Sequence, residues 1–397
     1  MLETKIIDPT DKKQLELYIH IPFCAKKCNY CDFLSFPVSE QYHSEYVDKL
    51  CGEIELTSEK IPAEREISTI FIGGGTPSLI DPKHIVRIMK TIRQHYHVRE
   101  NAEITIECNP ASTLAYKFTL YKNAGINRLS IGLQSADNRE LKTLGRIHIY
   151  EDFLKCFQNA RMEGFGNINI DLMNDIPGQT EKSWQDTLKH VLMLKPEHVS
   201  IYNLIIEEGT PFYGMYNEGR LTLPGEDTAS AIDEITRTIT GKYGFERYEV
   251  SNYAKPGFEC RHNYGYWSNV EYIGFGLGAA SYYDNRRWNN TRDFKKYMEL
   301  NFHMDMKNGW AELHTDVQVL DRNEQMEEFM FLGLRRIEGV SEVEFKTRFQ
   351  VDIMSIFGDK LSQYVSQGLI IHDGYRYRFS EHGMDVSNVI LSDFLLD

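Results

Sequence analysis

Short apolar runs and amphipathic segments alternate over the first 250 residues of the chain. Each apolar run covers five to seven residues, which is typical of a buried strand. The runs predict strands over residues 15–21, 67–72, 103–107, 127–132, 167–172 and 198–204. After each run, apolar residues recur every three or four positions and predict helices. These cover residues 39–60, 82–97, 151–162, 181–194 and 227–242, with a further helix ending near Gly125.

This alternation predicts six strand–helix units and therefore a parallel sheet with helical crossovers. Six units either curve part-way into a barrel or lie open as a doubly wound sheet, and the pattern does not decide between these architectures. In both of them, ligands bind at the carboxyl ends of the strands. Polar and glycine-rich stretches follow those ends at residues 24–31, 73–76, 107–109 and 134–135, so we expect the site there.

The pattern changes after about Ser251, where Gly, Tyr, Trp and Asn dominate and helical periodicity is weak. From Glu324 onward it predicts helices and then a hairpin whose strands, residues 369–372 and 375–379, flank Asp373-Gly374. Two helices and a hairpin predict a small winged-helix-like module. We therefore expect an α/β region at 1–250, an aromatic and glycine-rich connecting region at 251–316, and the module at 317–397.

Charge and apolar content exclude several functions. Lys and Arg number 44 against 58 Asp and Glu, and the net charge of −14 disfavours non-specific binding to nucleic acid. The segment 317–397 carries 8 basic and 14 acidic residues, which favours a docking or structural role over DNA reading. No apolar run approaches the ~18 residues of a spanning helix, and residues 1–13 lack a secretory apolar region. With seven cysteines, an odd number, we expect a reducing, cytoplasmic location.

Three of the seven cysteines fall within eight residues, as Cys24-x-x-x-Cys28-x-x-Cys31, directly after a predicted strand. Thiolates are soft ligands for iron–sulfur clusters or zinc. On a four-iron cluster, three protein ligands leave one iron open to a substrate or cofactor. A structural zinc site would need a fourth nitrogen or sulfur ligand. Unliganded, reduced thiols are the remaining alternative.

A second candidate element is the run Gly73-Gly74-Gly75-Thr76, which follows the next predicted strand. Without Cβ atoms, the backbone of such a run can approach a ligand closely, although a plain turn explains the run equally well. Polar side chains also follow later strands, and together they would line one mouth: Glu107, Gln134, Arg146 and Asp171. Carboxylates accept from ribose hydroxyls and an arginine binds a carboxylate, which suggests a ligand with an amine, a carboxylate and a ribose.

Several motifs together resemble radical S-adenosylmethionine (SAM) proteins: YIHIPFC with the cysteine loop, GGGTPS, IECNP, LSIGLQS, LGRIH and IDLM…PGQT. They are most similar to the family of oxygen-independent coproporphyrinogen III oxidase and its relative, the HemW-type haem chaperone. The resemblance covers nearly the whole chain. It implies a partial (β/α)6 barrel, which favours the barrel over the open sheet.

By position, the resemblance implies that Cys24, Cys28 and Cys31 hold a [4Fe–4S] cluster whose open iron binds the amino and carboxylate groups of SAM. It further implies SAM contacts from Tyr18, Tyr30, Gly74, Gly75, Thr76, Glu107, Gln134, Arg146 and Asp171. The chain departs from the family at Asn174-Asp175, where an aromatic–glycine pair is usual. Asn and Asp adopt positive φ less freely than Gly, so backbone approach there is less assured.

Two features resemble the chaperone branch more than the oxidase branch. The oxidase has a further cysteine where this chain has Phe33, and residues 262–267 match the HNxxYW motif of the chaperone. His262 is therefore a candidate haem ligand, with Cys260 as a second one. The alternative is a structural, hydrogen-bonded histidine in an aromatic patch. We expect Cys51, Cys108 and Cys156 to be buried small apolar residues.

The resemblance thus implies a haem chaperone that delivers haem to respiratory apo-haemoproteins. The alternatives are an oxidase that decarboxylates coproporphyrinogen III through a 5′-deoxyadenosyl radical, and a radical SAM enzyme that modifies haem. Whether the chain is an enzyme stays open at this stage. The implied partners are haem or a porphyrin, apo-haemoproteins and an electron donor such as flavodoxin or ferredoxin. The resemblance is also compatible with transient membrane-protein contact and with a homodimer, and implies no nucleic acid.

Overall fold

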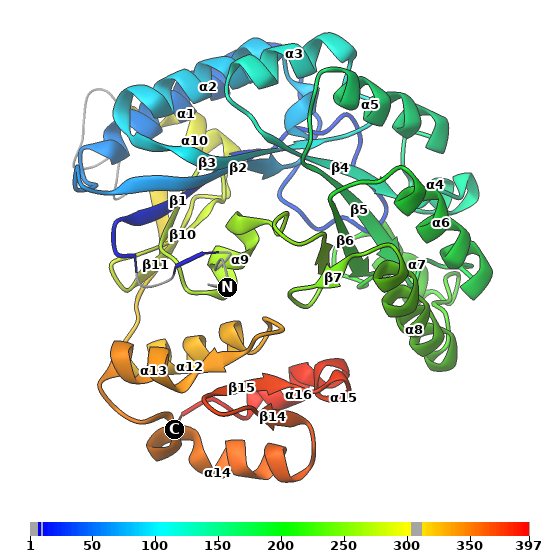
Figure 1. The fold of residues 1–397 in the computed structure, drawn as a ribbon. Coiled ribbons are helices and arrows are strands. Elements are labelled where there is room, and N and C mark those ends of the chain that lie inside the picture. Colours follow the sequence, from blue (N-terminus) through cyan, green and yellow to red (C-terminus); the bar gives the residue numbers. More distant parts are fainter. Residues whose placement is uncertain (1–6, 9–10, 303–311, 397) are drawn as a thin grey trace.

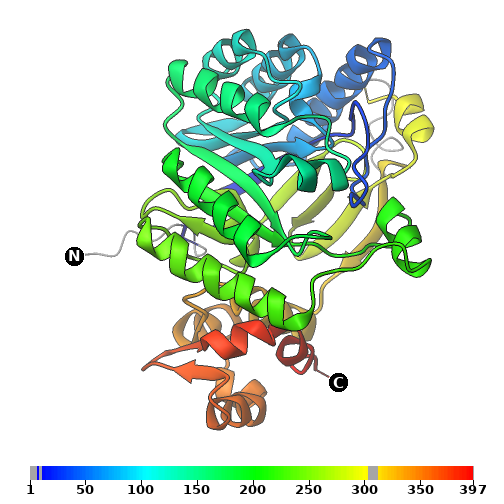
Figure 2. The same cartoon turned by 90° about the vertical axis from the view of Figure 1, so that its right-hand side faces the viewer.

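The computed structural model describes residues 7–8, 11–302 and 312–396, and six parallel strands form its centre. They are β1 (Gln14–Ile21), β2 (Glu66–Gly74), β3 (His97–Cys108), β4 (Arg128–Gln134), β5 (Ile168–Asn174) and β6 (His198–Asn203). The strands lie side by side in chain order, which confirms the predicted parallel sheet. Figures 1 and 2 show helices on the outer face of a curved sheet, as in a partial barrel.

The covering helices agree with the prediction to within a few residues. They are α1 (Gln41–Ser58), α2 (Pro82–His95), α3 (Ala115–Asn123), α5 (Tyr150–Met162), α6 (Glu181–Met193) and α8 (Glu226–Lys242). Helix α2 starts where the sequence indicates, because the Asp81 side chain accepts from the Lys83 N–H at 2.9 Å and Pro82 occupies the first turn. Three short elements lie in the loops: η1 (Pro77–Leu79), α4 (Asn138–Thr143) and α7 (Pro211–Asn217).

Strand β3 differs from the prediction, which placed its start at residue 103 and continued the preceding helix to residue 97. The helix ends at His95 and the strand begins at His97. The first residues of β3 pair with the start of β2, from Glu66↔His97 onward. Their side chains are largely exposed and polar, so this half of the strand has no apolar run to reveal it.

Residues from 246 onward extend the main sheet at both edges. Beside β6 lie β8 (Asn252–Ala254) and β7 (Glu246–Arg247). Beside β1 lie β9 (Tyr272–Phe275), which is parallel to it, and then β10 (Ala280–Tyr283), β11 (Arg286–Asn290) and β12 (His314–Val319). The segment also contains α9 (Arg261–Trp267) and α10 (Phe294–Glu299). The division of the chain at 250 and 316 stays a prediction.

Residues 322–396, called the C-terminal module below, form a second body under the sheet (Figure 1). It contains α12 (Arg322–Gly333), β13 (Val340–Ser341), α13 (Glu342–Phe349), α14 (Ile353–Ser366), β14 (Ile370–His372), β15 (Arg376–Phe379), α15 (Glu381–Asp385) and α16 (Ser387–Ser392). The predicted hairpin is present as β14 and β15, and β13 adds a third antiparallel strand. Buried apolar side chains such as Phe345, Phe357 and Leu361 form its core.

Candidate functional site at the carboxyl ends of the strands

A cavity of about 390 Å³, called the thiol cavity below, opens at the carboxyl ends of β2 to β6. Of the residues predicted for the site, Tyr18 and His262 do not line this cavity, and the others do. The predicted residues that line it are Cys24, Cys28, Tyr30, Cys31, Gly74, Gly75, Thr76, Glu107, Gln134, Arg146 and Asp171. Residues more than 140 positions apart therefore meet in one place, because parallel strands end at the same edge of the sheet.

Backbone hydrogen bonds hold the cysteine loop in place between β1 and α1. At its base, the Cys24 N–H donates to the Phe36 carbonyl at 3.2 Å, and the Phe36 N–H donates to the Pro22 carbonyl at 2.9 Å. Asn29 holds the middle of the loop in place, because its side-chain amide Nδ2 donates to the Thr143 carbonyl at 2.9 Å. The loop is thus fixed both to the end of β1 and to the end of α4.

The three thiols are partly exposed to the cavity. The Sγ of Cys24 lies 3.5 Å from the Thr76 hydroxyl, and Cys28 accepts from Arg146 Nη1 at 3.6 Å. Burial raises the pKa of Cys31, because desolvation disfavours the thiolate. A metal that binds these sulfurs would therefore have to displace a proton from Cys31, which makes loading depend on pH.

Glycine is required at two positions of the run beside this loop. A Cβ on Gly75 would lie 2.8 Å from the Phe23 carbonyl oxygen and 3.0 Å from the Sγ of Cys24. Gly74 has φ of +115°, and its Cβ would meet the His20 ring at 2.7 Å. The Gly74 N–H donates to Glu107 Oε2 at 3.0 Å. The run is therefore a close-approach element between the cysteine loop and β3 rather than a plain turn.

The far wall of the thiol cavity is acidic. Burial and the neighbouring Asp171 raise the pKa of Glu107 to about 8. Asp171 accepts from the Ser130 hydroxyl at 3.0 Å and from Asn169 Nδ2 at 2.7 Å, and burial raises its pKa as well. Two half-buried carboxyls, of which Asp171 has the buried Arg128 as a charged neighbour, favour a ligand that brings a further positive charge or hydroxyl donors.

The lining also carries a cation, Arg146, which lies beside the thiol of Cys28. The Arg146 guanidinium donates from Nη2 to the Gly132 carbonyl at 2.6 Å and faces Cys28 through Nη1. Gln134 comes from the strand end where β4 and β5 change register, and its φ is +76°. Carboxyls and a cation within one cavity suit a zwitterionic ligand that also carries hydroxyls.

Sequence comparison places the chain among known proteins. A profile of the radical SAM superfamily matches residues 18–191, and a profile of the HemN C-terminal domain matches residues 320–386. The heme chaperone HemW of Bacillus subtilis (strain 168) is 36% identical over 95% of this chain and 98% of its own. The heme chaperone HemW of Escherichia coli (strain K12) is 33% identical over 96% and 98%. The chain belongs to the HemW family of radical SAM proteins.

The fold of this HemW-family chain is also found in a solved structure. The coproporphyrinogen III oxidase HemN from Escherichia coli superposes with a TM-score of 0.83, covering 96% of this chain and 90% of that one. The two sequences are 22% identical, so the likeness concerns the fold. Membership of the radical SAM superfamily implies a [4Fe–4S] cluster and SAM as cofactors.

The residues of the thiol cavity fit that pair of cofactors. Among the described residues, no three His, Cys, Asp or Glu side chains converge on a point where a single metal ion would bind. A four-iron cluster binds each thiolate to a different iron and does not need such convergence. Beside the thiols, the glycine run lets the cysteine loop pack directly against its backbone, and the acidic and cationic parts of the lining match the charges of SAM. The assignment of each side chain stays a prediction.

Tyr18 and His262 lie outside the thiol cavity. The Tyr18 hydroxyl is 3.0 Å from His20 Nδ1, and its ring stacks on Phe71. His262 is 1% exposed; its Nδ1 lies 2.6 Å from the Thr69 hydroxyl and its Nε2 lies 2.9 Å from the Tyr266 hydroxyl. Burial lowers its pKa to about 3, so the imidazole is neutral. Ligation of haem by His262 would require α9 to give up these hydrogen bonds.

The other cysteines are where the sequence predicts them, since Cys51, Cys108 and Cys156 are buried. Cys260, the second candidate for haem, is also fully buried, and its Sγ lies 3.6 Å from Glu103.

The backbone at Asn174-Asp175, where the chain departs from the family, reaches a positive φ without glycine. Asp175 takes the left-handed φ of +57° itself, and its carboxylate accepts from Asn203 Nδ2 at 2.8 Å.

The structure adds residues to the site that the sequence analysis did not select. Ser130 lines the thiol cavity and donates to Asp171, and Tyr202 of β6 lines it as well. The sequence could have indicated Ser130. Ser130, Gly132 and Gln134 occupy every second position of β4 and therefore share one face of the sheet. Tyr202 follows a buried run and carries no motif of its own.

Proposed function

We propose that this chain is a haem chaperone that binds haem, a [4Fe–4S] cluster and SAM, and delivers haem to respiratory apo-haemoproteins. Its full-length similarity to proteins named heme chaperone HemW is the observation that carries the proposal. The thiol cavity supports it, because three cysteines, a close-approach glycine run and side chains of both charges lie together there. Within the described residues, no helix is long and apolar enough to cross a membrane.

In this proposal Cys24, Cys28 and Cys31 hold the cluster. When bound, the cluster supplies one-electron reduction of the SAM sulfonium. Gly74, Gly75 and Thr76 bring their backbone against the methionine part of SAM. Arg146 faces Tyr30 and the thiol of Cys28, so it offsets the negative charge that thiolates bring into a buried site.

On the acidic wall, Glu107 and Asp171 hold the ribose hydroxyls or the ammonium group of SAM. The proton that Glu107 retains at neutral pH leaves when a cation arrives, because an opposite charge lowers the pKa of a carboxyl. Gln134 supplies an amide from the strand end. Tyr18 acts from the layer behind the cavity through His20, whose ring packs on Gly74.

The proposal extends to an electron donor such as flavodoxin or ferredoxin, which would reduce the cluster. It also includes transient contact with the membrane proteins that receive haem. The decarboxylating oxidase remains the second candidate, because the fold matches that of HemN. Phe33 argues against it: this side chain is 60% exposed at the cavity, where the resemblance places a further cysteine in oxidases.

An anaerobic assay with two substrates separates these functions. The full chain with reconstituted cluster, SAM and dithionite is given either haemin followed by an apo-cytochrome, or coproporphyrinogen III. We expect haem to appear in the cytochrome by absorption spectroscopy, and no decarboxylated tetrapyrrole by mass spectrometry. A Cys28→Ser variant controls for dependence on the cluster. Stoichiometric decarboxylation of coproporphyrinogen III would refute the chaperone and identify an oxidase.

A further inference from the structure

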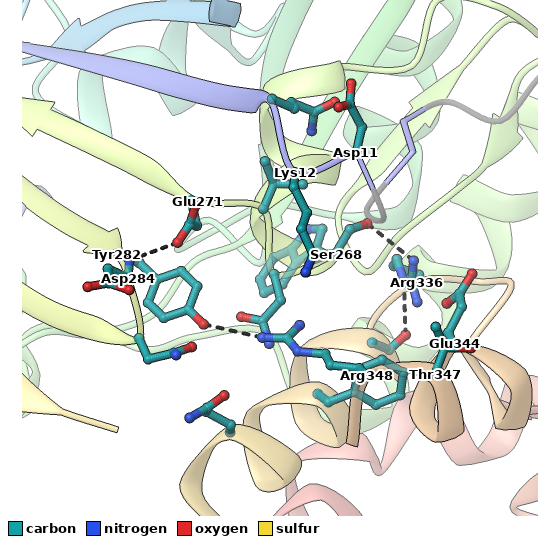
Figure 3. A pocket seen from close by; sticks show the side chains of 18 of the residues that line it. Asp11, Lys12, Ser268, Glu271, Tyr282, Asp284, Arg336, Glu344, Thr347 and Arg348 are labelled. Carbon is teal, nitrogen blue, oxygen red and sulfur yellow. Dashed lines mark hydrogen bonds between the residues drawn. The ribbon is translucent and has the colours of Figure 1, made fainter. Parts of the chain in front are cut away.

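A cavity of about 650 Å³ lies between the edge of the main sheet and the C-terminal module (Figure 3). Two hydrogen bonds cross it: Arg348 donates to the Tyr282 hydroxyl at 3.2 Å, and Arg336 Nη1 donates to the Ser268 hydroxyl at 3.2 Å. These bonds tie the module to the sheet edge, so the space belongs to the junction of two bodies. A second junction, which bears on the proposed function, lies beside the thiol cavity and is centred on Asn29.

Asn29 stands between Cys28 and Tyr30 in the cysteine loop and meets the carboxyl end of α4. Its N–H donates to the Leu144 carbonyl at 3.0 Å, and its side-chain Nδ2 donates to the Thr143 carbonyl at 2.9 Å. The last carbonyls of a helix have no partner within that helix. Asn29 therefore caps α4 with two bonds, although it precedes Thr143 by 114 residues.

The way in which α4 ends shapes the surface that Asn29 contacts. The Gly145 N–H donates to the Lys142 carbonyl at 3.1 Å, and the Arg146 N–H donates to the Leu141 carbonyl at 3.0 Å, which is the Schellman pattern. Gly145 has the left-handed φ of +75° that this pattern requires. A Cβ on Gly145 would lie 2.9 Å from Asn29 Oδ1. The side-chain amide of Asn29 thus packs directly on a position where glycine suits both the φ and the contact.

A third segment reaches Asn29 from the loop after β6. The Phe212 N–H, in the first turn of α7, donates to the Asn29 carbonyl at 2.9 Å. This N–H is one of those that the start of a helix leaves without an intrahelical partner. The Phe212 side chain is 1% exposed and shares an apolar cluster with Leu144, against which Tyr30 packs. Apolar packing of the next residue in the loop therefore supports the same junction.

The junction holds the direct neighbours of one thiol and of the cation in the thiol cavity. Asn29 follows Cys28, and Arg146 follows Gly145. Arg146 Nη1 lies 3.6 Å from the Cys28 Sγ, while Nη2 donates to the Gly132 carbonyl at 2.6 Å. Because Gly132 holds the guanidinium to β4, a shift of the cysteine loop away from α4 would move Cys28 away from Arg146.

We propose that Asn29 is a positioning residue that sets the contact between Arg146 and the sulfur of Cys28. This inference rests on the proposed function, in which Cys28 binds the cluster. Hydrogen bonds to the sulfurs and positive charge nearby raise the reduction potential of a cluster, because reduction adds negative charge. Asn29 tunes this potential through Arg146, and it ties the loop that carries the thiols to two helix ends.

The test is anaerobic and uses the full chain with reconstituted cluster. Asn29→Ala removes the bond to Thr143 and keeps the two backbone bonds at position 29, so the variant should fold. We expect its cluster potential, measured by a titration followed by EPR, to be more negative than that of the unaltered chain. We also expect a chelator to remove iron about two- to tenfold faster, as the loss of one hydrogen bond implies.

A double-variant cycle tests whether Asn29 acts through Arg146. Arg146→Met removes the guanidinium, so the addition of Asn29→Ala to it should shift the potential no further. Gly145→Ala displaces the Asn29 side chain from the other side of the contact, and it should shift the potential in the same direction as Asn29→Ala. A full further shift in the Arg146→Met background overturns the proposal.

Asn127→Ala is the matched control. The Asn127 side chain also donates to a backbone carbonyl, that of Ala102 at 2.7 Å, but it does so at the amino end of β4. Both the potential and the rate of iron loss should stay unchanged in this variant. The proposal is overturned if Asn29→Ala has the potential of the unaltered chain, or if the control shifts it equally, and the proposed function then still stands. If the unaltered chain assembles no cluster, the proposed function fails, and this inference fails with it.

Discussion

Gly75→Ala tests whether the glycine run and the cysteine loop are one rigid unit. The added Cβ would lie 2.8 Å from the Phe23 carbonyl oxygen and 3.0 Å from the Sγ of Cys24. An ordinary contact begins at 3.4 Å, so the two backbones must separate by about 0.6 Å. Gly75 has no positive φ, so the substitution acts only through this contact.

The cost follows from what resists that separation. The Gly75 N–H donates to the Ile21 carbonyl at 2.9 Å, and Cys24 is bonded to Phe36, so neither side moves freely. Overpacking of this kind costs about 1–3 kcal/mol. We expect the ligand-free variant to lose that much stability in urea unfolding. We also expect it to take up less iron and sulfide in anaerobic reconstitution, because Cys24 is displaced.

Gly166→Ala is the control, since a Cβ there meets nothing within 4 Å. It should leave cluster content unchanged and alter stability by less than about 1 kcal/mol. Suppose that Gly75→Ala binds iron, sulfide and SAM as the unaltered chain does and unfolds at the same urea midpoint. The close approach at Gly75 would then contribute nothing to stability or to cluster binding. The glycine run would then be an ordinary turn rather than a close-approach element.

Three further predictions address single side chains. Gly241→Ala, in the open part of α8, should raise the free energy of unfolding by roughly 0.5–1 kcal/mol, measured in urea, and a loss would contradict the open space there. The pKa of Glu107 is raised to about 8, so the protonated side chain stabilises the fold fully below pH ~4.5, and this contribution is lost as the pH rises through 8. In the ligand-free protein, the free energy of unfolding should therefore fall by an amount on the order of 4 kcal/mol over this range, and Glu107→Gln should remove that fall. His262→Ala should cost about 2 kcal/mol or more of stability, because Thr69 and Tyr266 lose their buried partner. Reduced haem affinity in a variant of unchanged stability would instead support His262 as the ligand.

Much of the barrel could be predicted because its strands are buried on both faces. In strands such as β5 and β6, apolar residues recur at least at every second position, and these short segments stand out from the polar loops around them. The site followed from the same regularity, since polar residues after parallel strands must meet at one edge. Asp171 and Arg146 could therefore be placed in one cavity without knowledge of their contacts.

The edge strands could not be predicted in this way. Strands β9 to β12 are short and rich in Tyr, Asn and Arg. Strand β9 pairs with β1, far earlier in the chain, and β10 to β12 pair in turn outward from β9. The environment of His262 was equally hidden, because its hydrogen-bond partner Thr69 is almost 200 residues away. A motif locates such a histidine but does not show whether its nitrogens are free.

The pairing of β9 with β1 has a consequence for how the protein is made. One edge of β1 is covered by β2, but the other waits for residues 272–275. Tyr46 joins β1 to the segment after β9, because its hydroxyl donates to the His20 carbonyl and accepts from the Leu277 N–H. The second of these bonds also waits for the later segment. At about 5–20 residues per second, a ribosome needs roughly 10–50 s to travel from one to the other. During that interval the strand that precedes the cysteine loop has one unpaired edge, although the loop's own contacts with Phe36 and Thr143 involve residues made much earlier. We therefore expect a nascent chain stalled before residue 272 to retain a cluster less firmly than the full chain does.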